Sequence, residues 1–192
     1  MQEQNKRVVG YQVSEAQRQN MLLAVATLIA NSSKKDEMFD DWHSLLGFRI
    51  GWLQEPFLTH LCSKMCIDPK EVEVVLMHAT GKTECHLHEH GESTFMTLGL
   101  SYGFEDATGG ILTNTYNAPV DVYKLERVPK KEGDIFTVKP NEIHAFFSDE
   151  NTLTAVGIVY PKIRKRDNVF DVVEFDFLTE GTDNPVVMKR MS

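Results

Sequence analysis

The sequence predicts a mainly β protein that begins with a helical segment. From about residue 71 onward, short runs rich in valine, isoleucine, phenylalanine and tyrosine alternate with turn signals such as Thr108-Gly-Gly110. No helical pattern separates these runs, which argues against a parallel α/β fold and for a closed or double-sheet barrel. Before residue 71 the apolar residues recur at helical spacing instead.

Residues 1–70 are expected to form a helical N-terminal extension. Ser14 can cap a first helix, whose apolar residues recur at helical spacing and which ends near Asn31. A second helix is expected over Lys35 to Phe48, and Pro56 suits the first turn of a third helix that ends near Cys66. The apolar faces of these helices must be buried, either against the outside of the barrel or across a homodimer.

Residues 71–178 are expected to form one β-barrel, and residues 179–192 a polar C-terminal tail. Val72, Val74, Leu76 and His78 alternate with their neighbours at a period of two, as in a strand. Eight further strands are expected, at Glu84–His88, Ser93–Phe104, Ile111–Tyr116, Val120–Val128, Asp134–Val138, Ile143–Phe147, Leu153–Tyr160 and Val169–Phe177.

Charge and composition exclude several classes of partner. The chain has 20 Lys and Arg against 28 Asp and Glu, a formal charge of -8, which disfavours nucleic acid and anionic membrane surfaces. The apolar stretch from Met21 to Ala30 is too short to span a bilayer and lacks the features of a secretory signal. The three cysteines, an odd number, give no disulfide framework, so a cytoplasmic location is expected.

A candidate metal site occurs in Glu84-Cys-His-Leu-His-Glu-His-Gly-Glu92. His86 and His88 are two residues apart, so on a strand both rings point to the same face. Glu92 has the same parity, although a bend at residues 89–91 leaves the direction of its carboxylate open. With His144 as a further ligand, three imidazoles and one carboxylate suit one divalent ion, with Fe(II) favoured and Mn, Ni, Co or Zn as alternatives.

This pattern resembles the cupin superfamily. His86-x-His88, three residues, Glu92, six residues and Gly99 resemble its first motif, and Gly133, Pro140 and His144 resemble its second motif more loosely. The resemblance implies a jelly-roll β-barrel over roughly Glu71 to Phe177. It also implies that His86, His88, Glu92 and His144 are metal ligands, and that the protein forms a homodimer.

Further residues are candidates for the same site. His78 is assigned to the buried face of its strand, where a position near the metal would give it a polar partner and a catalytic role. Tyr102 is a second catalytic candidate. Phe146 shares the parity of His144 and could line the pocket, whereas Cys85 has the opposite parity and should point away from the metal.

Three functions are consistent with such a site. The first is a dioxygenase in which ferrous iron binds a small substrate and dioxygen. The second is a sugar isomerase or lyase, in which the metal acts as a Lewis acid and His78 or Glu92 moves a proton. The third is a non-catalytic barrel that binds a metal or a small ligand. Of these, the dioxygenase is the primary hypothesis.

Overall fold

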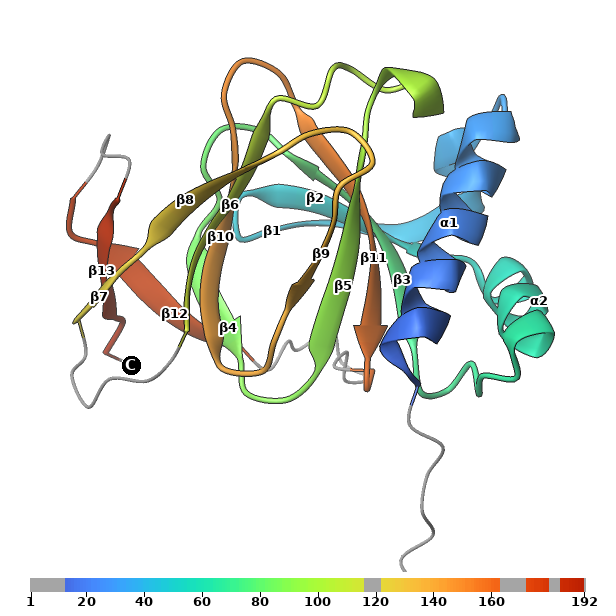
Figure 1. Cartoon of the computed structure of the whole chain (residues 1–192), viewed down its shortest axis with the longest axis horizontal. Helices are drawn as coiled ribbons and strands as arrows, with labels where there is room; N and C mark the ends of the chain where they lie inside the picture. The colour runs from blue at the N-terminus through green and yellow to red at the C-terminus, as the bar shows by residue number, and fades with distance from the viewer. Residues whose placement is uncertain (1–12, 116–121, 163–171, 180–183, 192) are drawn as a thin grey trace, which may run out of the picture.

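The computed structural model describes residues 13–115, 122–162, 172–179 and 184–191 of the chain. The predicted strand ends at Tyr116, Val120 and Val169 lie outside these ranges. Within them the fold is mainly β, with two α-helices and two short 3-10 helices (Figure 1). The helical elements are α1 (Glu15–Asn31), η1 (Lys35–Met38), α2 (Glu55–Met65) and η2 (Leu100–Tyr102). No helix in this part of the chain is long and apolar enough to cross a membrane.

The strands form two antiparallel sheets. In spatial order the six-stranded sheet contains β1 (Phe39–Leu45), β2 (Phe48–Leu53), β3 (Glu73–Ala79), β11 (Leu153–Tyr160), β5 (Glu92–Leu98) and β9 (Ile135–Val138). The seven-stranded sheet contains β7 (Val122–Lys124), β13 (Val186–Lys189), β12 (Val172–Phe177), β4 (Cys85–His88), β10 (Glu142–Ser148), β6 (Gly109–Thr115) and β8 (Glu126–Lys130).

The strands alternate between the two sheets along most of the chain. From β3 to β6 each strand lies in the sheet opposite the previous one, and the same holds from β8 to β11. This alternation gives the connectivity of a jelly roll, in which two sheets face each other around one interior. The predicted β-barrel architecture is therefore confirmed at the level of a jelly-roll β fold, and the barrel interior lies between β3, β11 and β5 on one side and β4 and β10 on the other.

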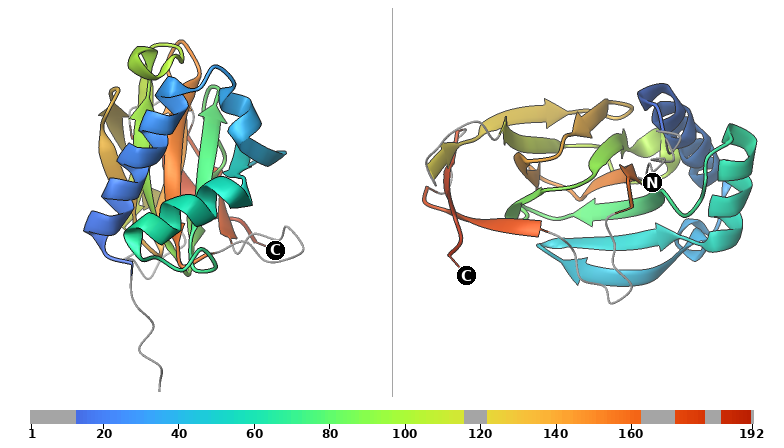
Figure 2. Two further views of the ribbon diagram at one scale, coloured as in Figure 1. Left: turned by 90° about the vertical axis from the view of Figure 1, so that its right-hand side faces the viewer. Right: turned by 90° about the horizontal axis from the view of Figure 1, so that it is seen from below.

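Helix α1 begins where the sequence predicts. Ser14 caps it, since the backbone N–H of Gln17 donates to the Ser14 hydroxyl and the backbone N–H of Ser14 donates to the Gln17 side chain. Both α1 and α2 lie on the outer face of the six-stranded sheet (Figure 2). Of the two expected ways to bury the helices, the structure shows the first, against the outside of the barrel.

The predicted second helix is wrong. Residues Phe39–Leu45 and Phe48–Leu53 form a β-hairpin that extends the six-stranded sheet, preceded only by the short η1. Leu46 and Gly47 both have positive φ, 50° and 82°, as a two-residue turn of type I′ requires. Asp41, at φ 52°, lies in a bulge that shifts the register between Asp40 and His43. The bulge breaks the period of two, so the apolar spacing imitates that of a helix.

The C-terminal segment is also more regular than expected. Within the expected tail, Val186–Lys189 forms β13, which pairs with both β12 and β7. Strands β7, β12 and β13 lie at the end of the molecule opposite the helices (Figure 1). Together with the β1–β2 hairpin, this strand shows that the sheets extend beyond both expected boundaries of the barrel.

Three hydrophobic cores follow from this layering. The first lies between α1, α2 and the outer face of the six-stranded sheet, and it contains Met21, Leu22, Val74, Leu76 and Met96. The second fills the barrel interior with aromatic and aliphatic side chains of both sheets. The third lies on the outer face of the seven-stranded sheet, where side chains of β7, β12 and β13 pack with those of β4, β6 and β10. Strand β3 is therefore buried on both faces.

Candidate metal centre

Two adjacent strands of the seven-stranded sheet bring the three candidate histidine ligands together. His86 on β4 and His144 on β10 are direct cross-strand partners, so their side chains leave the sheet on the same face. His88 is two residues beyond His86 on β4 and shares that face. The sheet thus joins two distant parts of the sequence at one point of the barrel interior.

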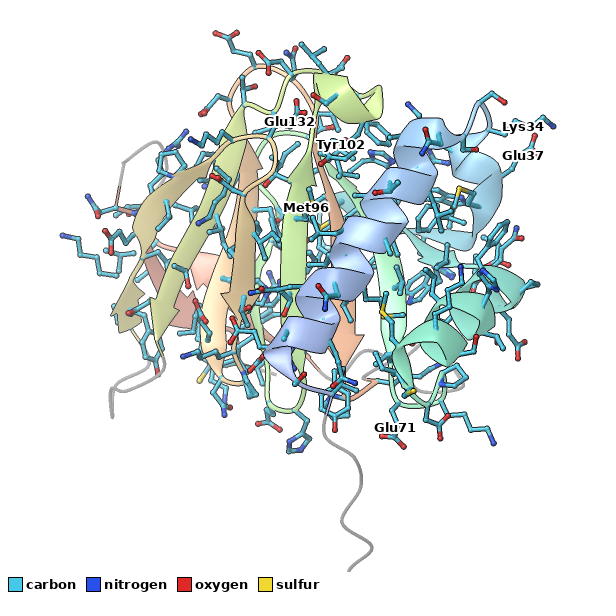
Figure 3. All side chains as sticks on the ribbon, turned by 45° about the vertical axis from the view of Figure 1, so that its right-hand side comes forward. Lys34, Glu37, Glu71, Met96, Tyr102 and Glu132 are labelled. Carbon is cyan, nitrogen blue, oxygen red and sulfur yellow. The ribbon has the colours of Figure 1, made fainter. Side chains whose placement is uncertain are left out.

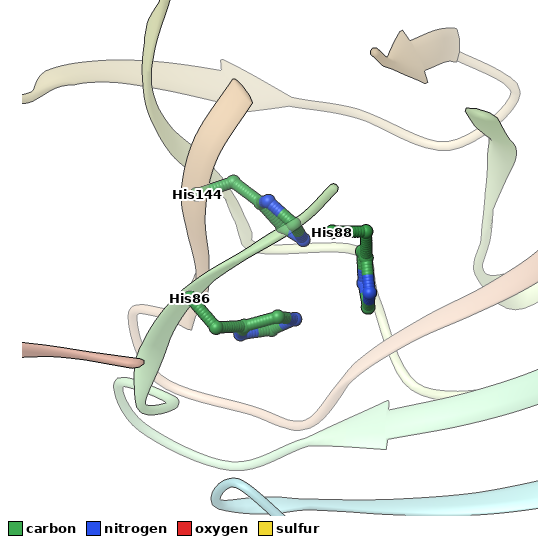
Figure 4. Close-up of side chains that lie close together, drawn as sticks. All are labelled: His86, His88 and His144. Atoms are coloured by element: carbon green, nitrogen blue, oxygen red, sulfur yellow. The ribbon is translucent and has the colours of Figure 1, made fainter. Parts of the chain in front are cut away.

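The three rings converge (Figure 4). Their centroids are 4.3 Å apart for His86 and His144, 5.0 Å for His86 and His88, and 5.5 Å for His88 and His144. One ligand nitrogen from each ring lies within 4.8 Å of the others. Two nitrogens bound to one ion at about 2.1 Å are at most about 4.2 Å apart. A small closing movement of the rings therefore suffices to hold one ion.

Backbone carbonyls fix how two of the rings are oriented. Nδ1 of His86 lies 3.2 Å from the carbonyl oxygen of Glu84, and Nδ1 of His144 lies 2.9 Å from that of Glu142. A carbonyl only accepts, so Nδ1 carries the proton in each ring and Nε2 keeps its lone pair. This arrangement is typical of metal-binding histidines, whose second nitrogen donates to a carbonyl or carboxylate.

Burial keeps two of the imidazoles neutral. It lowers the pKa of His86 well below its ordinary 6.5, and the neighbouring His144 and His88 lower it further. Burial also lowers the pKa of His144, partly opposed by the hydrogen bond to Glu142. Because a metal binds the neutral ring, these residues offer donors that need not first lose a proton near neutral pH. The three histidines therefore fit a divalent transition metal.

The lowered pKa values predict that the metal-free protein loses stability in mild acid. Below pH 6.5 the unfolded chain takes up protons at His86 and His144 that the folded chain does not bind, so falling pH favours unfolding. We expect the free energy of unfolding to fall by about 1–2 kcal/mol between pH 7.5 and pH 5.5. Urea unfolding at both pH values, in the presence of a chelator, measures this loss.

A pair of variants tests the origin of that pH dependence. His86→Gln should reduce the difference between the two pH values, whereas His60→Gln, at an exposed position of α2, should leave it unchanged. An equal slope in His86→Gln and the unmodified protein would contradict the assignment.

Glu92 does not join the three histidines. It is the first residue of β5, and its carboxylate pairs with Arg18 of α1, on the outer face of the six-stranded sheet. The guanidinium is buried and also donates to the Thr94 hydroxyl at 3.1 Å and to the Val13 carbonyl at 2.7 Å. Ser93 and Phe95, which have the opposite parity to Glu92, are the residues of β5 that line the histidine cavity. The bend after His88 thus places the Glu92 carboxylate on the outer face, which corrects its predicted assignment as a metal ligand.

His78 also lies elsewhere than expected. It shares a face of β3 with Val74 and Leu76, as its parity predicts, but this face is covered by the helices and the β1 segment, not by the histidine site. Its Nδ1 lies 3.0 Å from the Thr154 hydroxyl, and its ring stacks on Trp42 with centroids 5.7 Å apart. Its predicted place near the metal is therefore wrong.

Of the three remaining residues considered for the site, one lines the cavity and two lie outside it. Tyr102 lies in η2 and packs beside α1, outside the cavity of the three histidines (Figure 3). Phe146 does line that cavity, with its ring centroid 6.1 Å from that of His144. Cys85 points away from it into the third core, where burial raises the pKa of its thiol to about 12.

The histidines line a small cavity between the two sheets. Its other polar side chains are Glu73 and Ser93, and the rest of the wall is apolar, formed by Leu46, Phe48, Ile50, Trp52, Val75, Met77, Phe95, Phe146, Val159 and Val172. The volume is about 50 Å³, and on the same measure one water needs about 10–15 Å³. The cavity therefore accommodates a molecule of about three to five non-hydrogen atoms.

Sequence reasoning missed two contributions to this wall. Phe48, Ile50 and Trp52 come from β2, in the N-terminal extension, where a helix was expected to end at Phe48 and no strand was expected. Glu73 was assigned no role, although it shares the parity of Val75 and Met77, which face the interior. A carboxylate inside an otherwise apolar strand is an unusual signal, because burying a charge is costly, and it could have drawn attention to this position.

Gly157 lets an aromatic side chain form part of the wall. A Cβ atom at this position of β11 would lie 2.5 Å from Cε1 of Phe95 and 3.1 Å from Cγ2 of Val75. Gly157→Ala should therefore push the Phe95 ring into the cavity and lower the free energy of unfolding by about 1–3 kcal/mol. Urea unfolding measures the loss, and an unchanged midpoint would show that the sheet relaxes around the methyl group.

Comparisons with known proteins show distant structural similarity. No family model matches the chain, and no curated sequence matches it. A nucleoside dehydratase of Streptomyces covers 75% of this chain and 90% of its own, at 17% identity and a TM-score of 0.45. KdgF from Halomonas sp. covers 68% of this chain and 94% of its own, at 12% identity and a TM-score of 0.43.

A third similar structure is the capsular polysaccharide assembling protein CapF from Staphylococcus aureus. It covers 68% of this chain and 32% of its own, at 9% identity and a TM-score of 0.47. These scores and identities are low, so the fold assignment rests on the strand order and the site assignment on the three histidines.

Proposed function

We propose that this chain is a metal-dependent protein of the cupin type that acts on a small molecule. The observation that carries the proposal is the convergence of three buried imidazoles, from two adjacent strands, on one small enclosed cavity. The strand order supports the cupin assignment, because cupins are jelly rolls and the motif histidines lie on the paired strands β4 and β10.

The donor set indicates the kind of ion and its charge. Among the residues that the structure describes, no carboxylate joins the three-histidine group. Three neutral imidazoles suit Fe(II), Co, Ni, Cu or Zn and leave coordination positions open. They also leave the full double positive charge on the ion, which favours an anionic or oxygen-bearing small molecule as the next ligand.

The finer proposal is a dioxygenase that uses Fe(II). When bound, such an ion would supply the redox chemistry that the side chains lack. The chain itself supplies the geometry: His86, His88 and His144 hold one side of the ion, and the aromatic wall of Phe48, Phe95 and Phe146 excludes water. The size of the cavity limits the substrate to a few non-hydrogen atoms.

One observation favours a second candidate, a metal-dependent isomerase or lyase. That reaction needs a side chain that moves a proton, and the expected proton carriers His78 and Glu92 both lie outside the cavity. Glu73, however, is a carboxylate that lines it. The second candidate is therefore retained with Glu73 as its proton carrier.

Metal analysis followed by assays with and without oxygen tests this proposal. Protein purified without chelator should contain close to one equivalent of a divalent transition metal, and removal of the metal should lower the melting temperature. The metal-loaded protein is then screened against small anions and carbonyl compounds. Oxygen uptake with iron supports the dioxygenase, and anaerobic turnover supports the isomerase. A protein that binds none of the candidate metals would overturn the proposal.

A further inference from the structure

Glu73 occupies an unusual position for a carboxylate. It is the first residue of β3, it is only 4% exposed, and it lines the same cavity as the three histidines. Strand β3 belongs to the six-stranded sheet and β4 and β10 to the seven-stranded sheet, so Glu73 and the histidines come from opposite walls. The cavity therefore has a group of imidazoles on one wall and a carboxylate on the other.

An ion pair accounts for part of this burial. Nζ of Lys162 lies 3.6 Å from Oε1 of Glu73, beyond the range of a strong hydrogen bond, and the lysine side chain is 43% exposed. A partly solvated lysine at this distance offsets only a fraction of the cost of burying a carboxylate. The lysine can also turn to solvent when another donor reaches Glu73.

Glu73 is not a fourth metal ligand, although it lines the same cavity as the three histidines. Glu73 is not among the residues whose ligand atoms lie within 4.8 Å of one another, so it does not complete the histidine group. Glu73 and the three histidines nevertheless line one cavity of about 50 Å³ from opposite walls, so a small ligand bound beside the metal would lie next to the carboxylate.

We propose that Glu73 is the specificity-determining residue of the site, and that it binds the hydrogen-bond donor end of a small molecule whose anionic end lies on the metal. The proposal rests on the metal site proposed above. It names the ligand class as small hydroxy or amino acids and related molecules with a donor atom three bonds from a metal-binding oxygen. Ser93, also on the cavity wall, provides a further polar contact on the same side.

Two probes of the same shape test the inference. Glycolate and propionate each have five non-hydrogen atoms and one carboxylate, and they differ in whether the far end is a hydroxyl or a methyl group. Titration of each into the cobalt-loaded protein is followed by the visible absorption of the cobalt ion. A hydrogen bond to a charged acceptor predicts that the protein binds glycolate at least about 10-fold more tightly than propionate.

Variants assign the preference to Glu73. Glu73→Met removes both acceptor oxygens at similar volume and should bring the two affinities within about 2-fold of each other. Glu73→Gln keeps one acceptor without the charge and should retain part of the preference. Glu71→Met is the matched control, because Glu71 is exposed at the lower edge of the molecule (Figure 3) and lies two residues away; it should keep the full preference.

Each outcome has a separate meaning. If the unmodified protein binds no cobalt, the proposed metal site itself fails. If it binds cobalt but does not prefer glycolate, or if Glu73→Met keeps the preference, the inference about Glu73 is wrong while the metal site stands. Should Glu73→Met fail to fold, judged by circular dichroism, the comparison of the unmodified protein with Glu73→Gln decides. An equal preference in these two proteins would overturn the inference.

Discussion

Replacing His86 by alanine should weaken the binding of a divalent metal by at least about 100-fold. His86 is buried, faces His144 across two paired strands and offers its Nε2 to the cavity. Loss of an outer partner of a metal ligand typically costs about 10–100-fold in affinity, and loss of the ligand itself costs more. Competition against a chromophoric chelator for zinc or cobalt measures the affinity, and circular dichroism checks that the variant is folded.

A nearby histidine supplies the matched control. His90 lies two residues after His88 and is exposed. His90→Ala should bind metal as tightly as the unmodified protein, within about 2-fold, because it lies outside the group whose nitrogens converge. Equal losses of metal affinity in the two variants would indicate metal binding by surface imidazoles. No loss of affinity in either variant would contradict the assignment of the three-histidine centre.

One pair of the histidine group, His86 and His88, could be predicted because local geometry fixes it. Two residues of one strand at a spacing of two must share a face, and His86 and His88 do so. His144 could be added only through the resemblance to cupins, because no local rule pairs β10 with β4 across more than fifty intervening residues. Burial of the rings, which lowers the pKa of His86 and of His144, is a property of the assembled barrel.

Glu92 and His78 show where parity arguments end. The alternation of side chains holds within one strand but does not continue through a bend. The bend between β4 and β5 therefore leaves Glu92 facing outward and Ser93 facing inward. For His78 the parity was right and the side was wrong, because both faces of β3 are buried. A strand covered by helices on one face and by a second sheet on the other carries no sequence signal of which face is which.

The β1–β2 hairpin shows how an irregular strand escapes a periodic pattern. Because of the bulge around Asp41, the side chains of Phe39 and Trp42, which are three residues apart, pack against the same core, as neighbouring side chains of a helix would. The consequence reaches the site, because Phe48, Ile50 and Trp52 of this hairpin form part of the cavity wall. The size and polarity of the cavity therefore could not be predicted without the tertiary structure.

Replacing Arg18 by methionine should destabilise the protein by about 2–3 kcal/mol. The guanidinium joins α1 to the six-stranded sheet through Glu92 and Thr94 and also donates to the Val13 carbonyl. Its removal leaves a carboxylate that is only 29% exposed without its cation. Removing one partner of a largely buried ion pair costs more than the pair contributes, because the remaining charge stays in a poorly solvated position. Urea unfolding measures the change.

The partner of Arg18 separates the structural role of this pair from metal binding. In a double-mutant cycle with Glu92→Gln, the two substitutions should be strongly non-additive, since both act on one interaction. Glu92→Gln alone should keep the metal affinity within about 2-fold, because its carboxylate lies on the outer face of β5 and Ser93 takes the inward position. A loss of about 100-fold in Glu92→Gln would instead show that the carboxylate turns inward when metal binds, and that Arg18 holds it in the metal-free state.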